Sequence, residues 1–346
     1  MEIQLAQDVP GIGKAGERVT LALQPSDVHD PSEIPTYLAG YKPFGYRADE
    51  ASAPILVDKD EDKYRTFDSD DAFKVVNVKT SSQAAVPEVD PKSSLTNYKV
   101  VDRFVGAFIP TVTELNSSNP NYEPRMAAAR RCRRAIDLDR EVDVFALLGT
   151  LTNWDASVRT AITGGNEWDD QTNGDPILDI QTAIEKSWQP VTEIWMNQVV
   201  AHLFLRHTKV REHMKQMMGE NAVAGAAANV AGAGNANVDF RITGLPVIRV
   251  VASKYKNEST GALAPVLSSD VVVLTTVPVG VPNSGEEIAS THTFRRRGPS
   301  GVGFEAREYF VPGRGPLGGT MVVVSMADIA VMTGSKAGGI ITNISP

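Results

Sequence analysis

The longest helical pattern in the chain runs from residue 123 to 148, in the sequence EPRMAAARRCRRAIDLDREVDVFALL. Its apolar positions have the three- and four-residue spacing of a helix, but they change sides along its length. The early members are Ala128, Cys132 and Ile136, and the later members are Leu138, Val142, Phe145 and Leu148. We therefore predict one long helix that contacts different neighbours along its length, bounded by NPNYEP before it and TGGNEWDDQTNGDP after it.

Shorter helices and strands are predicted downstream. Asp175 followed by Pro176 is typical of a helix start and predicts a helix over 177–188. Residues 191–196 predict a strand, and Asn197 and Thr208 predict the caps of two further helices. The alanine- and glycine-rich residues 219–237 predict a loop. Strands are predicted over 240–253, 270–279, 303–312, 319–326 and 338–344, so the fold class is α+β.

The first 112 residues predict mostly extended structure. Residues 1–60 interleave short apolar pieces with Pro, Gly and Asp, which is typical of an arm that forms little core. Residues 61–112 predict an extended β-hairpin loop, whose two strands are joined by a polar, proline-containing segment. A two-stranded ribbon is marginal on its own, so we expect its apolar residues to pack on an adjacent subunit. These residues are Phe67, Phe73, Val75 and Val76.

Composition narrows the partners that the chain can have. Its 346 residues, 42% of them apolar, are enough for about two domains with substantial cores. The net charge of −8 disfavours a dedicated nucleic-acid binder, because the overall field repels polyanions. The single cysteine, Cys132, excludes an internal disulfide and fits assembly in a reducing cytoplasm. No apolar run reaches the roughly 20 residues that cross a bilayer, so we expect neither membrane insertion nor secretion.

No combination of residues predicts a catalytic, cofactor or metal site. The segment GIGKAG at 11–16 matches G-x-G-x-x-G, but a strand pattern follows where a dinucleotide site needs a helix, so a glycine-rich turn is favoured. His202, His207 and His213 are five and six residues apart, a spacing that does not bring them onto one helix face. A nucleotide-dependent enzyme that uses these glycines stays open as a minor alternative.

The arginines of the long helix are its candidate contact residues. Arg130, Arg133 and Arg134 share one flank with Asp137 and Glu141, at separations of three and four residues. The charges therefore compensate one another, which favours a structural beam within or between subunits. Arg130, Arg133 and Arg134 are the candidate inter-subunit contacts on this helix, and a nucleic-acid grip is the alternative.

The order of these segments resembles the major capsid proteins of tailed bacteriophages, whose Hong Kong phage-type fold is shared with encapsulin shells. The resemblance rests on VGAFIP, on Arg140 and Glu141, on Trp168 with Asp169 and Asp170, on Asp175 with Pro176, and on FEAREYFVPGRGPLGGTMVVVSMADIAVM with GGIITNI. It implies an N-terminal arm at 1–60, an extended loop at 61–112, a peripheral domain with a spine helix at 113–190 and an axial domain at 191–346. Strands around 294–325 would return to the peripheral domain.

The resemblance also implies a function. The chain would be a structural protein without catalytic residues, cofactor or metal, and would self-assemble as hexamers and pentamers into an icosahedral phage head around double-stranded DNA. It would assemble in the host cytoplasm and become part of the virion, without a membrane. Implied partners are copies of itself, a separate scaffolding protein, a portal protein and packaged DNA in weak non-specific contact, with decoration proteins left open. The alternative is an encapsulin-type nanocompartment shell.

Overall fold

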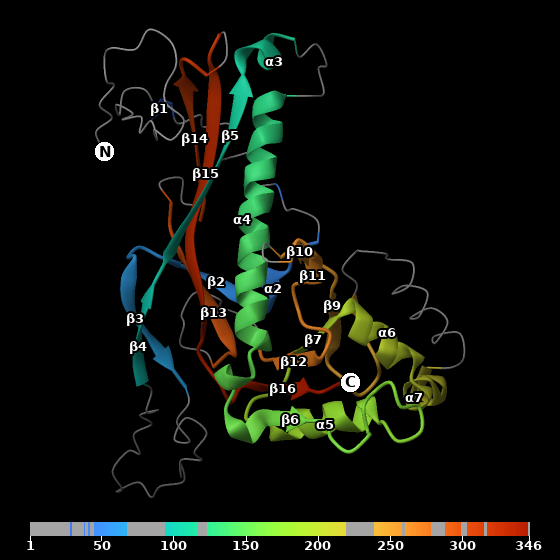
Figure 1. Ribbon diagram of the computed structural model, residues 1–346. Helices are drawn as coiled ribbons and strands as arrows, with labels where there is room; N and C mark the ends of the chain where they lie inside the picture. Colours follow the sequence, from blue (N-terminus) through green and yellow to red (C-terminus); the bar gives the residue numbers. More distant parts are fainter. Residues whose placement is uncertain are drawn as a thin grey trace, which may run out of the picture. The chain divides into compact units, whose positions relative to one another are not determined.

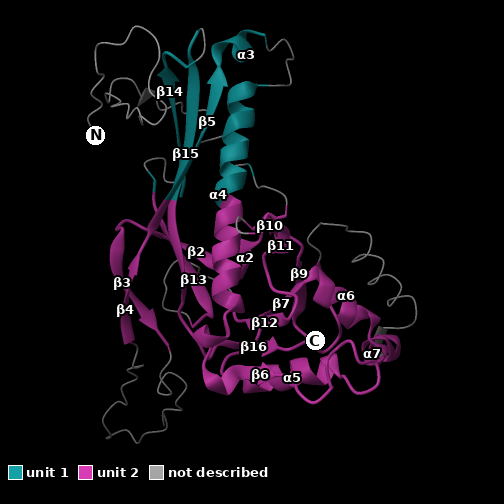
Figure 2. Ribbon diagram, in the orientation of Figure 1, with its two compact units in different colours: residues 1–42, 103–136, 298–326 teal, residues 43–102, 137–297, 327–346 magenta. Residues whose placement is uncertain are grey.

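The computed structural model describes residues 28–29, 38, 41, 45–67, 94–116, 123–218, 239–257, 260–277, 288–298, 303–314 and 317–344. The chain divides into two compact units whose sequences interleave (Figures 1 and 2). Unit 1 comprises residues 1–42, 103–136 and 298–326, and unit 2 comprises residues 43–102, 137–297 and 327–346. The glycine motif at 11–16, the hairpin residues 68–93 and the loop at 219–237 lie outside the described residues.

Unit 1 is a sheet packed against a helix. Its elements are β1 (Val28–His29), β5 (Val101–Pro110, from residue 103), α3 (Thr111–Leu115), α4 (Pro124–Gly149, to residue 136), β14 (Glu305–Val311) and β15 (Gly319–Met332, to residue 326). β14 pairs antiparallel with both β1 and β15, and β5 pairs with β15. Alternate residues of β15, Val322, Val324 and Met326, are buried in one core with Cys132 and Ile136 of α4. Ala128 and Ala129 of α4 belong to the same core, and these small residues let the helix lie close to the sheet.

A glycine allows β5 to lie close to the start of β15. A Cβ atom at Gly319 would come within 2.6 Å of the Phe108 ring, nearer than real side chains approach. A larger residue at this position would push the two strands apart.

Unit 2 contains a six-stranded sheet in the order β6-β16-β12-β7-β9-β8. The strands are β6 (Arg159–Ala161), β7 (Glu193–Asn197), β8 (Asp239–Phe240), β9 (Val247–Val251), β12 (Val271–Thr275) and β16 (Gly338–Thr342). All five residues of β12 are buried, as expected of a central strand covered on both faces. Its neighbours β16 and β7 both run antiparallel to it, with Val273 opposite Trp195 of β7.

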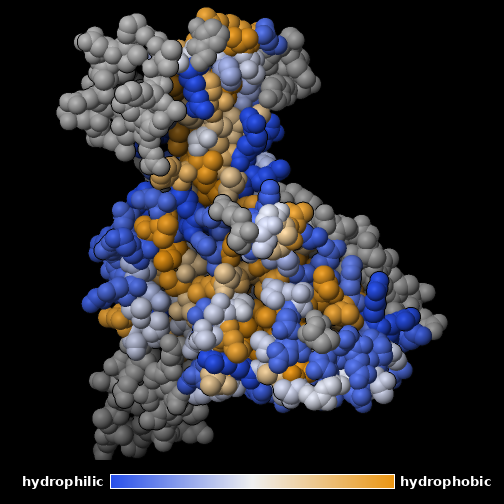
Figure 3. Space-filling view, viewed as in Figure 1, coloured by the Kyte–Doolittle hydropathy of each residue, from blue (hydrophilic) through white to orange (hydrophobic). Residues whose placement is uncertain are grey.

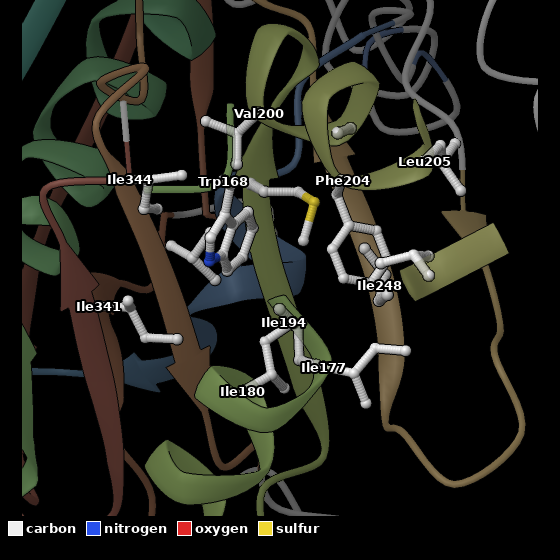
Figure 4. Packing of buried hydrophobic residues seen from close by; sticks show 14 of the residues in the cluster. Trp168, Ile177, Ile180, Ile194, Val200, Phe204, Leu205, Ile248, Ile341 and Ile344 are labelled. Atoms are coloured by element: carbon white, nitrogen blue, oxygen red, sulfur yellow. The ribbon is translucent and has the colours of Figure 1, made fainter. Parts of the chain in front are cut away.

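Helices cover both faces of this sheet. On one face, α5 (Pro176–Lys186), α6 (Gln198–Arg206) and α7 (Thr208–Met218) enclose the larger core, in which Ile194 of β7 packs near Ile180 and Phe204 of the helices (Figure 4). On the other face, Trp195 and Val273 join a second core with the part of α4 from residue 137 onward. Neighbouring strand residues therefore belong to different cores, as the alternation of a strand requires.

Unit 2 also contains short helices, a strand pair and two two-stranded ribbons. They are α2 (Ala48–Ala51), β2 (Ala53–Val57), β3 (Glu61–Thr66), β4 (Ser94–Lys99), η3 (Leu151–Asn153), η4 (Ala156–Val158), β10 (Lys254–Lys256), β11 (Leu263–Pro265) and β13 (Thr291–Arg296). β13 pairs antiparallel with β15 and parallel with β2. Ala48, Ala51 and Ile55 are buried here, so the expectation of little core in residues 1–60 is wrong for this part of the chain.

Most local predictions agree with the elements. The long helix runs from Pro124 to Gly149, and the Asp175 carboxylate accepts a hydrogen bond from the backbone N–H of Leu178 at 3.2 Å. Asn197 caps α6 in the same way. The prediction that Thr208 caps α7 is wrong, because the Thr208 backbone is already helical and its N–H and hydroxyl both bind Gln171.

Candidate functional site

The arginines of α4 lie in different surroundings. In unit 1, Arg133 is buried, and its guanidinium lies 4.4 Å from the centre of the Phe304 ring. Arg134 is exposed and Arg130 is half-buried. Because Arg133 is enclosed by its own subunit, it is not available as the surface contact that the sequence suggested. Contacts of Arg130 and Arg134 with a neighbouring subunit stay a prediction.

Farther along α4, in unit 2, five side chains form what we call the charged cluster: Arg140, Arg295, Asp49, Asp137 and Asp328. The guanidinium of Arg140 donates to Asp49 at 2.5 Å and to Asp137 at 3.3 Å, and it also pairs with Asp328. Arg295 donates to Asp49 at 2.5 Å and lies 3.6 Å from Asp328. The five side chains therefore come from four separate segments of the chain, and the two arginines contact three carboxylates between them.

Charge complementarity in the cluster outweighs burial for two of its members. Desolvation alone would lower the pKa of Arg140, but the carboxylates of Asp328, Asp49 and Asp137 raise it, so the guanidinium stays charged. Desolvation would raise the pKa of Asp49, but Arg140 and Arg295 lower it to about 2. The side chain of Asp49 is 44% exposed, whereas those of Asp137 and Asp328 are buried. The buried aspartates thus depend most on the arginines.

Glu141 has a role that the sequence did not indicate. Its carboxylate accepts hydrogen bonds from the backbone N–H groups of Arg47 and Ala48, at 2.7 and 2.6 Å, and from the hydroxyl of Ser253 at 3.0 Å. The expected compensation of the Arg133 and Arg134 charges by Glu141 is therefore wrong, because Glu141 caps the start of α2. Burial raises the pKa of Glu141 to about 7, although its hydrogen bonds oppose the shift.

The charged cluster and Glu141 together fasten residues 47–49 to α4 and to the strands beside it. Each carboxylate of this group faces an arginine, a backbone N–H group or a hydroxyl. None of these contacts involves a nucleophile such as a serine paired with a histidine base, so the arrangement supports a structural role. Because removing one partner of a buried ion pair leaves an uncompensated charge, these contacts hold the segments in one arrangement.

The base of the predicted hairpin is present in unit 2. β3 and β4 pair antiparallel, from Glu61 opposite Lys99 to Thr66 opposite Ser94. Phe67 is only 5% exposed, and its N–H donates to the carbonyl of Thr333. The premise that Phe67 lacks a core in its own subunit is therefore wrong. Phe73, Val75 and Val76 lie outside the described residues, and their packing stays a prediction.

Both units leave large apolar side chains uncovered. In unit 1, Phe104 of β5 is 73% exposed and Leu115 of α3 is 74% exposed, and Phe310 and Leu317 are also exposed. Hydrophobic residues gather on the visible face of both units in Figure 3. These residues are large apolar side chains in contact with water in the described structure.

Histidines and carboxylates offer no metal site in the described part of the chain. There, no group of three or more His, Cys, Asp or Glu residues is placed to hold an ion. His207, which is buried, lies 3.1 Å from the carbonyl of Asp170 through Nε2 and accepts the N–H of Lys209 at Nδ1, so its ring joins a loop to the start of α7. No helix in these residues is both long and apolar enough to cross a bilayer.

We compared the sequence and the structure with those of known proteins. No family model and no curated protein matches the sequence. The structure superposes on a phage-related protein of Bordetella bronchiseptica RB50 with a TM-score of 0.65 and 16% identity, over 91% of this chain and 97% of that chain. The chain has the phage major capsid fold.

Two further structures with this capsid fold agree. The putative capsid protein of a prophage of Escherichia coli CFT073 gives a TM-score of 0.56 and 14% identity, over 92% of this chain and 99% of that chain. The capsid of Cyanophage P-SCSP1u gives 0.52 and 11%, over 88% and 89% of the two chains. The fold class predicted from the sequence, α+β with the phage major capsid fold, is confirmed.

Sequence reasoning found part of the charged cluster of this capsid fold. Asp137 stood out in the helix pattern and Arg140 in the resemblance to capsid proteins, but their partners Asp49 and Asp328 did not stand out. The available signal was a run of charged residues, DRE at 139–141, at positions that the helical periodicity places near apolar neighbours. A charged residue predicted to be buried must have a partner of opposite charge, but the sequence does not identify which residue that partner is.

Proposed function

We propose that this protein is the major capsid protein of a tailed phage, whose copies assemble as hexamers and pentamers into an icosahedral head around double-stranded DNA. The observation that carries the proposal is the fold match, which extends over 91% of this chain and 97% of the Bordetella protein. Two proteins with the same fold are described as capsid proteins. In this proposal the chain has a structural role and no catalytic one.

The exposed apolar residues support assembly. Phe104, Leu115 and Phe310 are large side chains of unit 1 that the subunit itself leaves in water. Obligate interfaces bury about 2,000 Å² or more, and they have a more apolar core than the rest of a protein surface. Packing between subunits would cover these residues.

The remaining parts of the proposal follow the capsid role. The hairpin residues Phe73, Val75 and Val76 would pack on an adjacent subunit. A scaffolding protein and a portal protein would be separate chains, and the head would assemble in the host cytoplasm. The buried thiol of Cys132, whose pKa is raised by burial, fits that reducing compartment.

Electron microscopy of the purified full-length chain tests the proposal. Uniform closed shells with five- and six-fold capsomers in negative stain are the expected result. A chain that stays monomeric even when it is produced together with its scaffolding protein would contradict it. The contents of particles purified from the producing cells distinguish a phage head from the encapsulin-type alternative. Double-stranded DNA that is protected from DNase indicates a phage head, whereas an enclosed protein cargo indicates an encapsulin-type compartment.

A further inference from the structure

Three arginines of α4 occupy the side of the helix that faces away from the unit 1 core. Cys132 and Ile136 are buried in that core. At about 100° per residue, Arg130 and Arg134 point roughly opposite to Cys132, and Arg131 lies beside them. We call Arg130, Arg131 and Arg134 the arginine face. Hydrophilic residues line this part of α4 in Figure 3.

Two members of the arginine face have no carboxylate partner within the described residues. Arg131 and Arg134 are both exposed, and neither makes an ion pair with that part of the chain. Arg125, nearer the start of the same helix, differs, because it pairs with Glu114 at 2.9 Å and with Glu308 at 3.1 Å. The positive charge of α4 in unit 1 is therefore least compensated at Arg131 and Arg134.

The described residues of unit 1 carry a net positive charge although the whole chain is negative. The described residues of unit 1 contain eight arginines and four glutamates, a net charge of 8 − 4 = +4. The arginines are Arg103, Arg125, Arg130, Arg131, Arg133, Arg134, Arg307 and Arg314, and the glutamates are Glu114, Glu123, Glu305 and Glu308. Since the chain carries −8, its remaining residues carry −8 − 4 = −12. A polyanion would thus be attracted more to the described part of unit 1 than to the remaining residues taken together.

We propose that the arginine face binds the phosphate backbone of DNA, without sequence preference. The inference rests on the proposed function, in which double-stranded DNA lies inside the shell. Arginine suits this role because its planar guanidinium donates two hydrogen bonds to one phosphate. Side chains three residues apart on a helix are about 5–6 Å apart at Cβ, so Arg131 and Arg134 can contact successive phosphates of one strand.

The chemistry of the face favours DNA over a second copy of the chain. A stable protein interface needs an apolar or aromatic centre, and charges at its rim contribute little. Beside the arginines lie Ala127 and Ala135, which offer only methyl groups. The large exposed apolar residues of unit 1 belong to β5, α3, β14 and the segment before β15.

Fluorescence anisotropy with a labelled 30-bp duplex of mixed sequence tests the proposal on the full chain, between 50 and 200 mM salt. The variant Arg131→Gln with Arg134→Gln removes two charges that have no carboxylate partner among the described residues. Its matched control is Arg296→Gln with Arg297→Gln, which removes the same charge from a pair held by Asp58, Asp60 and Asp102. A lysine version, Arg131→Lys with Arg134→Lys, keeps the charge without the planar guanidinium.

The glutamine variant should bind the duplex on the order of tenfold more weakly at 50 mM salt. The slope of log affinity against log salt is negative, and it should become less steep by about two, because each lost phosphate contact removes about 0.9 from its magnitude. The control should stay within about threefold of the parent protein with an unchanged slope, and the lysine version should keep the parental slope.

Three outcomes would overturn the proposal. An unchanged slope in the glutamine variant, or an equal loss in the variant and its control, would mean that the face makes no specific phosphate contact. Normal DNA binding together with lost shell formation would assign the face to a neighbouring subunit. Shell formation is examined in the same preparations by negative stain, so failure of this inference is distinguished from failure of the capsid proposal.

Discussion

Replacing Arg140 by methionine tests the charged cluster. The substitution keeps an unbranched side chain of similar length in the helix and removes the guanidinium that contacts Asp49, Asp137 and Asp328. Arg140 itself is 3% exposed, so no water replaces these contacts without a change in structure. The variant therefore isolates the electrostatic role of one buried side chain.

The expected loss follows from the burial of the partners. Asp137 and Asp328 are buried, and stranding a buried charge costs about 3–5 kcal/mol. Asp49 adds little because water screens an exposed carboxylate. Arg295 remains 3.6 Å from Asp328 and offsets part of the cost. We expect the free energy of unfolding of unit 2 to fall by about 3 kcal/mol.

Urea denaturation followed by tryptophan fluorescence measures this loss. Trp154, Trp168 and Trp195 are fully buried in unit 2, so their emission reports on the unit that contains the cluster. Light scattering selects conditions in which the subunits are unassembled. The matched control is Arg134→Met, an exposed position on the same helix but in unit 1, so its stability is also followed by calorimetry and should change by no more than about 0.5 kcal/mol.

A second variant separates a stranded charge from lost packing. Adding Asp328→Asn to Arg140→Met removes the buried charge and should recover at least about 1 kcal/mol. The reasoning is refuted if Arg140→Met is as stable as the Arg134 control. It is also refuted if Asp328→Asn makes the double variant less stable than the single one.

Three further predictions concern Arg133, Glu141 and the hairpin residues 80–95. Arg133→Ala should destabilise unit 1 by about 1–2 kcal/mol because it loses the stack on Phe304, whereas Arg134→Ala should be nearly neutral in calorimetry. The pKa of Glu141 is raised to about 7, so its contribution to the free energy of unfolding is fully present below about pH 4.5 and is lost as pH rises through 7. Urea titrations across this pH range should therefore show a fall in stability that Glu141→Gln abolishes. Deleting residues 80–95 should leave a soluble fold but impair shell assembly, and normal shells in negative stain would contradict the hairpin proposal.

Signals confined to a few neighbouring residues were readable in the sequence. Asp175 and Pro176 start α5 because a cap needs only a side chain and an N–H group three residues later. The long helix was predictable from its spacing, and its actual bounds are Pro124 and Gly149. Thr208 was the exception, because the glutamine that binds it lies 37 residues earlier.

Only the tertiary structure decided which segments meet. β2 pairs with β13, with Ala53 opposite His292, and Arg140 meets Asp328 across 188 residues of sequence. A helix or strand period specifies which side chains share a face, and it carries no information about the segment that covers that face. Sequence and structure differ most in what they tell about buried charges. A buried charge needs a partner of opposite charge, and the sequence offers several distant carboxylates that are chemically equivalent until the chain has packed.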